Sequence, residues 1–195
     1  MSRKGDETRI RILTSAWQLL EAPGGGAVRM SDIARTAGIS RQALYLHFPN
    51  RADLLVATTR YIDEVKDIDA RLAASRAATG GVERLDAYIA AWGGYIPQIH
   101  GVATALMSMQ DHDAEARVAW AGREAAMREG CAAAVTALQR DGTLTPDLSA
   151  AAATDMLWTL LLVRNWDRLV QECGWSQEVY IREMRRLARA ALVAG

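Results

Sequence analysis

The chain has 195 residues, of which 50% are hydrophobic and 24% are charged, a balance typical of a globular protein and not of a disordered one. A chain of this size buries enough surface to form a core without disulfides or metals. Its two cysteines, Cys131 and Cys173, stand at no metal-ligand spacing. This composition excludes a collagen-like fibre, a disulfide-rich secreted scaffold and a membrane protein. We expect a cytoplasmic protein with reduced thiols, no metal and no cofactor.

Charge is divided unevenly along the chain. Residues 1–60 contain nine Lys or Arg and five Asp or Glu, which gives them a net charge of +4. The remainder contains 14 basic and 18 acidic residues, which gives it a net charge of −4. A basic segment on an acidic body is typical of a protein that meets a polyanion with one end. An excess of four charges also arises by chance, so charge alone leaves both interpretations open.

Helices are predicted along nearly the whole chain, because the alternation typical of strands is missing and only four prolines occur. Apolar residues recur at intervals of three and four between Thr8 and Glu21, which predicts an amphipathic helix there. Its inward-facing residues are expected to be Ile10, Leu13, Trp17 and Leu20. The segment Pro23–Gly26 is expected to end this helix, because proline lacks a donor and glycines leave the backbone loose.

Two short helices are predicted next. The first spans residues 30–37, and the second follows Ser40, a favourable N-cap residue, and runs through His47. A longer helix is expected over residues 51–78, capped by Asn50. Further helices are predicted at residues 82–96, 101–110, 113–141, 146–172 and 177–193. The expected fold is therefore all-α, with about nine helices: three form an N-terminal helix-turn-helix domain, and a larger helical domain follows.

The segment Ser31–Tyr45 has the pattern of a helix-turn-helix, in which two short helices meet at Gly38. Small and apolar residues would pack between the helices: Ile33, Ala34, Ala37, Ile39 and Leu44. A helix fits the major groove of DNA, which is about 12 Å wide, and its N-terminal residues reach the base edges first. In this sequence those residues are Arg41 and Gln42.

Arg41 and Gln42 carry side chains suited to reading bases. Arginine can donate two hydrogen bonds to guanine O6 and N7, and glutamine can pair with adenine N6 and N7. Contacts to DNA phosphates are expected from polar residues around them. These residues are Ser31, Ser40, Tyr45, His47 and Arg51. The alternative is that Tyr45 only packs and that Arg41 and Gln42 are solvated surface residues, and a helix-turn pattern alone leaves it open.

The residues that follow the pattern favour DNA binding. The stretch Leu44–Leu55, LYLHFPNRADLL, closely resembles the TetR family of bacterial transcriptional regulators, and the resemblance covers about residues 7–60. It implies that the residues named above read bases and grip the DNA backbone as the family does. The sequence departs from the family at Arg29, where a Ser or Thr usually caps the first short helix. The remaining two thirds of the chain resemble the family only in length and helix order.

Large aromatic and methionine side chains stand among alanines beyond residue 80. Plain core packing explains any one of them. The resemblance implies a site for a small apolar or aromatic effector among the middle helices. We expect it to be lined by Trp92, Tyr95, Met107, Met109, Trp120, Trp158, Leu162, Asn165 and Trp166. The amide of Asn165 either orients such a ligand or satisfies the protein's own hydrogen bonds.

The last two helices are predicted to associate with a second copy, because they carry more apolar surface than one subunit needs to bury. The resemblance implies that two copies pair these helices in a four-helix bundle, so a two-fold homodimer is expected. The expected interface consists of Met156, Leu160, Tyr180, Met184, Leu187 and Ala191.

Sequence signatures of an enzyme are missing. We find no Gly-x-Ser-x-Gly, no phosphate-binding glycine loop and no cysteine with a credible histidine partner. His100 and His112 have acidic neighbours but no specific metal-ligand spacing. No catalytic residues are therefore expected.

These observations lead to one principal hypothesis. Residues 1–50 are expected to bind double-stranded DNA, and residues 51–195 are expected to bind an effector and dimerise. The protein would be a homodimeric transcriptional regulator, a repressor that binds a palindromic operator and is released by a small molecule. One alternative is an architectural or division-linked DNA-binding protein without an effector, and a second is a helical ligand carrier or enzyme. An open effector cavity would argue against the first, and steeply salt-dependent DNA binding would argue against the second.

Overall fold

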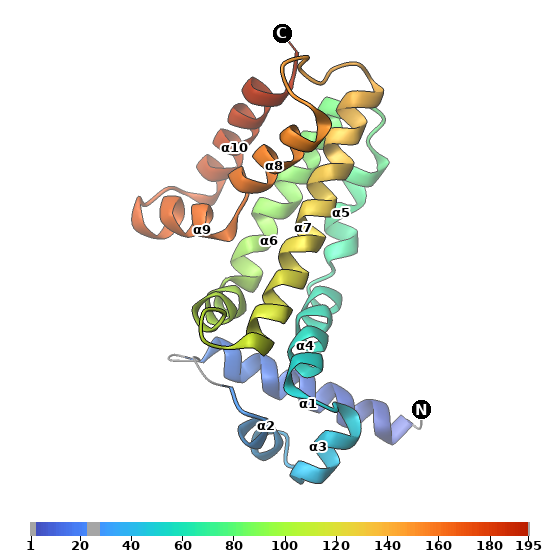
Figure 1. Ribbon diagram of the computed structural model, residues 1–195, viewed down its shortest axis with the longest axis vertical. Helices are drawn as coiled ribbons and strands as arrows, with labels where there is room; N and C mark the ends of the chain where they lie inside the picture. The colour runs from blue at the N-terminus through green and yellow to red at the C-terminus, as the bar shows by residue number, and fades with distance from the viewer. Residues whose placement is uncertain (1–2, 23–27, 195) are drawn as a thin grey trace. The chain divides into compact units, whose positions relative to one another are not determined.

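The computed structural model describes residues 3–22 and 28–194 (Figure 1). Within these ranges the chain forms ten α-helices and one π-helical turn, and its only extended pairing is an isolated bridge between Leu144 and Val193. The predicted all-α fold class is thus confirmed. The loop expected at residues 23–26 lies outside the described residues.

Several helices have the bounds that the sequence predicts, whereas others differ from the predicted bounds. In chain order the helices are α1 Arg3–Glu21, α2 Met30–Thr36, α3 Arg41–His47, α4 Arg51–Val65, α5 Ile68–Ala77, α6 Gly81–Met109, α7 Ala114–Arg140, α8 Ala150–Leu160, α9 Val163–Trp166 and α10 Gln177–Leu192. Three side-chain oxygens each accept the backbone N–H three residues later, and so cap α3 and α4, as predicted, and also α10. They belong to Ser40, Asn50 and Ser176.

The chain forms two compact units. The first unit contains α1 to α4 together with Ile99–Arg123, and the second contains Asp67–Gln98 together with the chain from Glu124 onward. The long helices α6 and α7 therefore each contribute to both units. The functional boundary expected at residue 50 is a different kind of division, and it stays a prediction.

The core of the first unit is built around α1, which packs against α2 and α4. Its buried side chains are Ile12, Leu13, Ala16 and Leu20. Ile10, predicted to face inward, is exposed. The buried face of α1 includes Ile12 and Ala16, which the periodicity did not predict there, because both α2 and α4 pack against this helix. Trp17 is half-buried, and its ring contacts the ring of Tyr61 edge-on at 6.5 Å between centroids.

The single helix predicted over residues 51–78 is divided in two. The chain turns at Lys66 and Asp67, and Asp67 adopts a left-handed backbone conformation with φ of 52°. The side chain of Asp67 accepts a hydrogen bond from the N–H of Ala70 at 3.2 Å and so caps α5. Aspartate tolerates this conformation better than most residues because its short side chain can bond to the local backbone.

The single helix predicted over residues 146–172 is also divided. Helix α8 ends at Leu160, α9 begins at Val163, and a π-helical turn follows over Asp167–Glu172. The side-chain amide of Asn165 donates to the carbonyl oxygens of Thr159 at 2.6 Å and of Leu160 at 3.2 Å. Asn165 therefore satisfies carbonyl groups that the end of α8 leaves without helical partners.

Two helices expected at residues 82–96 and 101–110 are instead one helix, α6, which continues through Pro97. Proline has no N–H, so the carbonyl oxygen of Gly93, four residues earlier, loses its helical donor. The side-chain amide of Gln177, at the start of α10, donates to this oxygen at 2.6 Å. The other amide atom of Gln177, Oε1, accepts from Nε1 of Trp166 at 2.8 Å. This side chain therefore replaces the hydrogen bond that proline removes.

Replacing Gln177 with alanine should lower the free energy of unfolding by about 1–3 kcal/mol, because it leaves the Gly93 carbonyl and the Trp166 indole without partners. Denaturant titration measures the change. In a Pro97→Ala background the restored N–H can bond to the Gly93 carbonyl, so the same substitution should cost less. Equal costs in the two backgrounds would contradict the compensating role of Gln177.

Candidate nucleic-acid interface

Helices α2 and α3 form a helix-turn-helix whose turn depends on Gly38 (Figure 1). Gly38 has φ of 64°, the left-handed region in which glycine carries no steric cost. At this turn the N–H of Gly38 donates to the Arg35 carbonyl at 3.1 Å, and the N–H of Ile39 donates to the Ala34 carbonyl at 3.0 Å. The predicted packing between the helices is largely present, because four of its five residues are buried: Ile33, Ala34, Ala37 and Leu44.

The first turn of α3 presents Arg41 and Gln42 to solvent. Among the described residues, neither side chain forms a hydrogen bond or an ion pair, so both are available for a ligand. The hydroxyl oxygen of Ser40 accepts the N–H of Ala43 at 3.1 Å, which fixes the start of the helix. Leu44 is fully buried beneath α3 and holds it against the domain. The two predicted base-reading residues thus stand on a short, fixed helix.

The predicted phosphate-binding residues fall into two groups. Ser31, Tyr45 and His47 are exposed or half-exposed on α2 and α3. Ser40 uses its oxygen as an acceptor in the α3 cap, and its O–H stays able to donate. These four residues therefore stay candidates for phosphate contact.

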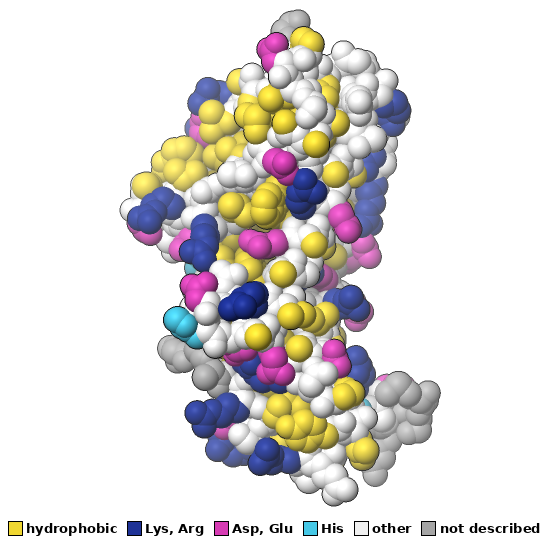
Figure 2. All heavy atoms as spheres, in the orientation of Figure 1, with side chains coloured by type: hydrophobic (Ala, Val, Ile, Leu, Met, Phe, Trp, Pro, Cys, Tyr) yellow, Lys and Arg dark blue, Asp and Glu magenta, His cyan; other side chains and the backbone are white. Residues whose placement is uncertain are grey.

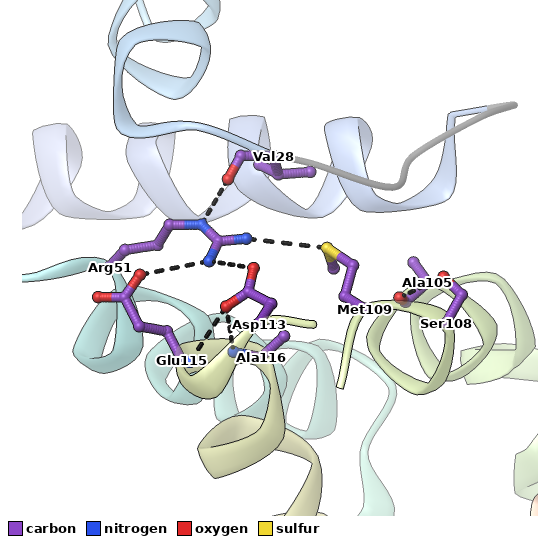
Figure 3. A network of polar contacts seen from close by, with 8 residues as sticks. All are labelled: Val28, Arg51, Ala105, Ser108, Met109, Asp113, Glu115 and Ala116. Atoms are coloured by element: carbon purple, nitrogen blue, oxygen red, sulfur yellow. Dashed lines mark hydrogen bonds and ion pairs between the residues drawn. The ribbon is translucent and has the colours of Figure 1, made fainter. Parts of the chain in front are cut away.

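Arg51 has a different role from the one predicted. Its side chain is only 13% exposed and is held within the first unit (Figure 3). Its Nε donates to the carbonyl oxygen of Val28 at 2.5 Å, and one Nη donates to Asp113 at 2.7 Å and to Glu115 at 3.3 Å. The other Nη lies 3.8 Å from the sulfur of Met109. The guanidinium is therefore engaged with protein groups and is not free to grip a phosphate.

Asp113, the main partner of Arg51, uses its two oxygens differently. One oxygen accepts the N–H groups of Glu115 at 3.1 Å and Ala116 at 3.0 Å and caps α7, and the other accepts from Arg51 (Figure 3). Burial acts to raise the pKa of Asp113. The hydrogen bonds from the Ala116 N–H and from Arg51 outweigh this effect, and the pKa is lowered from 3.8. Arg51 thus joins the segment before α2, the start of α4 and the start of α7.

Sequence reasoning missed Asp113 and Glu115 as part of this network. The signal available was the N-cap pattern of an aspartate just before a predicted helix, which fixes the aspartate but not its arginine partner. Leu46 on α3 was not singled out from the sequence either, although its side chain is 84% exposed beside Tyr45.

Positive charge stands on the same part of the first unit. Arg29, Arg35 and Arg41 are exposed, and Figure 2 shows Lys and Arg side chains gathered over α2. Asp32 pairs with Arg35 at 2.7 Å and neutralises one of these charges. Helix α2 begins at Met30, and its N-cap residue Arg29 makes no side-chain cap hydrogen bond. An exposed set of guanidinium groups beside a fixed helix favours a polyanionic ligand.

Comparison with known proteins agrees with this geometry. The sequence profile described as "Bacterial regulatory proteins, tetR family" matches residues 12–58, which run from α1 into α4. Over these residues the chain is similar to this family.

Curated relatives match about a third of the chain. The nucleoid occlusion factor SlmA of Marinomonas is 34% identical over 64 residues, 33% of this chain and 32% of that protein. The HTH-type transcriptional regulator TtgR of Pseudomonas putida is 35% identical over 72 residues, 37% of this chain and 34% of that protein. The match spans about a third of the length of these relatives. The family description names regulatory proteins and not enzymes, in agreement with the sequence.

Solved structures share the fold over nearly the whole chain. A transcriptional regulator from Saccharomonospora viridis, solved in complex with choline, has a TM-score of 0.74 at 22% identity and covers 97% of this chain and 100% of its own. NalD, a repressor of an efflux pump in Pseudomonas aeruginosa, has a TM-score of 0.73 at 21% identity and covers 98% of both chains. At these identities the likeness shows a shared fold and nothing more.

The residues expected to line an effector site belong to two different units. Trp92 and Tyr95 are buried in the second unit, with their rings 6.1 Å apart, and the indole N–H of Trp92 donates to the Leu161 carbonyl at 2.9 Å. Four more residues of the expected effector site belong to the second unit: Trp158, Leu162, Asn165 and Trp166. Met107, Met109 and Trp120 belong to the first unit. Asn165 and Trp166 both bond to protein groups, as described above.

Trp120 lines a small gap in the first unit, which is bounded by α4, α6 and α7. The gap has a volume of about 20 Å³, and the paired side chains of Asp63 and Arg123 form part of its wall. This volume holds about one water molecule.

The residues expected at the dimer interface also fall into two groups, one buried in the subunit and one lining an open groove. Tyr180 and Met184 are buried in the core of the second unit, so we correct their placement on an outer face. They lie on the side of α10 that packs within the subunit, whereas Leu187 is exposed. The other four line an open apolar groove of about 580 Å³ beside α8 and α10: Met156, Leu160, Leu187 and Ala191. Figure 2 shows hydrophobic side chains gathered in this part of the chain.

None of the described helices combines the length and the apolar character needed to cross a membrane. In the described ranges no three His, Cys, Asp or Glu side chains are grouped in a way that could hold a metal ion. Cys131 is buried and Cys173 is exposed, and both are free thiols.

Proposed function

We propose that the protein is a DNA-binding transcriptional regulator that acts as a homodimer and reads a palindromic operator in double-stranded DNA. One observation carries the proposal: α3 holds Arg41 and Gln42 exposed, without partners among the described residues, on the first turn of a capped helix that Leu44 anchors in the core. These two side chains match the hydrogen-bonding edges of guanine and adenine in the major groove. Curated relatives that match part of the chain are named HTH-type transcriptional regulators, which supports the proposal.

The contacts that position the domain on DNA are proposed to come from Ser31, Ser40, Tyr45 and His47. Each can donate a hydrogen bond to a phosphate oxygen, and such contacts fix the register of a protein on the duplex without reading sequence. Arg51 is left out of this set because its guanidinium is bonded to protein groups.

The apolar groove beside α8 and α10 supports the proposed homodimer. Met156 is 45% exposed and Leu187 is 38% exposed, and exposed apolar surface of this kind marks an interaction site. The same two helices of a second copy would cover it in a two-fold, self-complementary contact. Recognition helices held about 34 Å apart would then read two half-sites one turn apart.

Replacing Leu187 with glutamate should convert the dimer to the 21.3 kDa monomer, because it places a charge in the groove. Operator affinity should fall about a hundredfold, since the second half-site no longer binds at high effective concentration. Sedimentation and binding titrations measure the two effects. The matched control is Val118→Glu, which changes an exposed apolar residue of α7 outside the groove. An unchanged mass for the Leu187 variant would refute this dimer surface.

We further propose that the regulator is a repressor released by a small effector. Solved structures with the same fold include complexes with choline and with stearoyl-CoA, which supports a small-molecule site in the helical domain that follows residue 50. The small gap beside Trp120 is the proposed starting point, because α4, α6 and α7 meet there. An effector larger than water would have to move these helices apart, and α4 carries the helix-turn-helix domain at its start.

A second candidate is a DNA-binding protein that needs no effector. It is favoured by the burial of Trp92 and Tyr95 and by the small volume beside Trp120. One curated relative, matched over 64 residues, is named a nucleoid occlusion factor, which is consistent with such a role.

Selection of bound duplexes from a random pool tests the proposed function. The expected outcome is a palindromic consensus with two half-sites centred about 10 base pairs apart, bound with an affinity that falls steeply as salt rises. Recovery of no consensus, together with salt-independent binding, would overturn the proposal. Addition of metabolite pools to the selected complex then separates the two candidates, because only an effector-controlled regulator would release the duplex.

A further inference from the structure

A second groove follows α10, separate from the apolar groove. It has a volume of about 600 Å³, which is within the range of small-molecule sites, and it shares no lining residue with the apolar groove. Its lining comes from α6 and α10 and is dominated by arginines: Asp86, Glu178, Ile181, Arg182, Arg185, Arg186 and Arg189. All of these residues belong to the second unit.

Three of the arginines are held in the same way, by their Nε atoms. Nε of Arg185 donates to the backbone carbonyl of Asp86 at 3.0 Å. Nε of Arg182 and Nε of Arg186 donate to the two carboxylate oxygens of Glu183, at 3.0 Å and 2.7 Å. Among the described residues, the Nη atoms of these three side chains form no hydrogen bond. Each guanidinium is therefore fixed on one side and keeps its remaining donors for another partner.

The charges of the groove are not balanced locally. Arg189 is paired with the carboxylate of Asp86, and Glu183 alone serves both Arg182 and Arg186. Among the described residues, Arg185 has a carbonyl partner but no carboxylate partner. Like charges three and four residues apart on one helix repel each other. Glu178 also lines the groove and Arg189 is already paired with Asp86, so an anion would be stabilised chiefly by Arg182, Arg185 and Arg186.

We propose that this groove binds a ligand that carries a diphosphate or a similarly extended polyanionic group. The planar fork of arginine matches phosphate oxygens with two parallel hydrogen bonds. From Arg182 to Arg186 the helix rises about 6 Å, which matches two linked phosphates better than a single phosphate or carboxylate. Because the Nε atoms are already anchored, little side-chain freedom is lost when the ligand binds. The site is independent of the proposed DNA contacts, since none of its residues lies in α1 to α4.

Calorimetric titration of the full chain with inorganic pyrophosphate tests this proposal. The expected result is saturable binding of one pyrophosphate per subunit. Arg185→Gln should weaken it about tenfold or more, because a charge-assisted hydrogen bond is lost. Arg185→Lys should lie between, since it keeps the charge but not the fork. The matched control is Arg168→Gln, whose side chain is 70% exposed and lies outside the groove, and it should leave the affinity unchanged.

Several outcomes would overturn the proposal. These are no binding at millimolar pyrophosphate, an equal loss in Arg168→Gln, or tighter binding of a polyglutamate peptide, which would assign the face to an acidic protein partner. Thermal unfolding identifies a variant that fails to fold, in which case Arg186→Gln replaces Arg185→Gln. Because no DNA is present in this experiment, its failure would leave the proposed regulator function untouched.

Discussion

Replacing Arg41 with alanine should lower the affinity for the selected operator by about 1–3 kcal/mol and relax the base preference at one position of each half-site. The loss should be smaller on a scrambled duplex, because Arg41 is proposed to read a base edge and not the phosphate backbone. Fluorescence anisotropy on the two duplexes measures both affinities. In the same assay Gln42→Ala should relax a neighbouring position.

The matched control is Arg29→Ala, an exposed arginine just before α2 that is not proposed to read bases. It should weaken both duplexes alike, through charge alone. If Arg41→Ala lowers the affinity for the operator and for the scrambled duplex equally, or lowers neither affinity, the assignment of α3 as the base-reading helix is wrong.

Replacing Arg51 with alanine should lower the free energy of unfolding by about 1–3 kcal/mol. The substitution leaves Asp113 and the Val28 carbonyl without their common donor in a partly buried site. It should also weaken DNA binding, because the segment before α2 loses its link to α4. The slope of affinity against salt should stay unchanged, whereas loss of a true phosphate contact would lower that slope by about one.

Asp113→Asn distinguishes a positioning role from a direct contact. Removal of a negative charge should favour DNA binding by electrostatics alone, but loss of the Arg51 partner should weaken binding. Weaker binding of Asp113→Asn would support the positioning role of Arg51. Tighter binding, with a reduced salt slope in Arg51→Ala, would return Arg51 to the set of phosphate contacts.

The same carboxylate predicts a pH dependence. The pKa of Asp113 is lower in the folded protein than its ordinary value, so its contribution to stability is present above the unfolded pKa, about 3.9, and is lost as the pH falls through the folded pKa. Below about pH 4 the free energy of unfolding should therefore fall more steeply in the original protein than in Asp113→Asn. Parallel curves from acid titrations of the two proteins would contradict this linkage.

The helix-turn-helix could be predicted from sequence because its determinants are local. Gly38 at the turn, Ser40 at the cap and the small residues between the helices all act within a few positions of one another. The role of Arg51 could not be predicted, since its partners Asp113 and Glu115 are more than 60 residues away. A family motif gives the residue type at position 51 but not which of two anions, a carboxylate or a phosphate, it meets.

The errors in helix bounds have the same origin. Pro97 predicts a break by local rules, and α6 continues through it because Gln177, far along the chain, bonds to the freed carbonyl. Tyr180 and Met184 share a face with Leu187 by helical spacing, yet tertiary packing covers the first two and leaves the third exposed. Periodicity identifies an apolar face, but it does not divide that face between the subunit's own core and a partner.

The left-handed turn at Asp67 restricts which amino acids can occupy that position. The residue must adopt φ of 52° and also supply an oxygen to the N–H of Ala70. Glycine meets the first demand but supplies no side-chain oxygen, serine and threonine supply the oxygen at a steric penalty, and valine and isoleucine meet neither demand. Asparagine shares both abilities with aspartate, so a library randomised at residue 67 should be enriched in aspartate and asparagine.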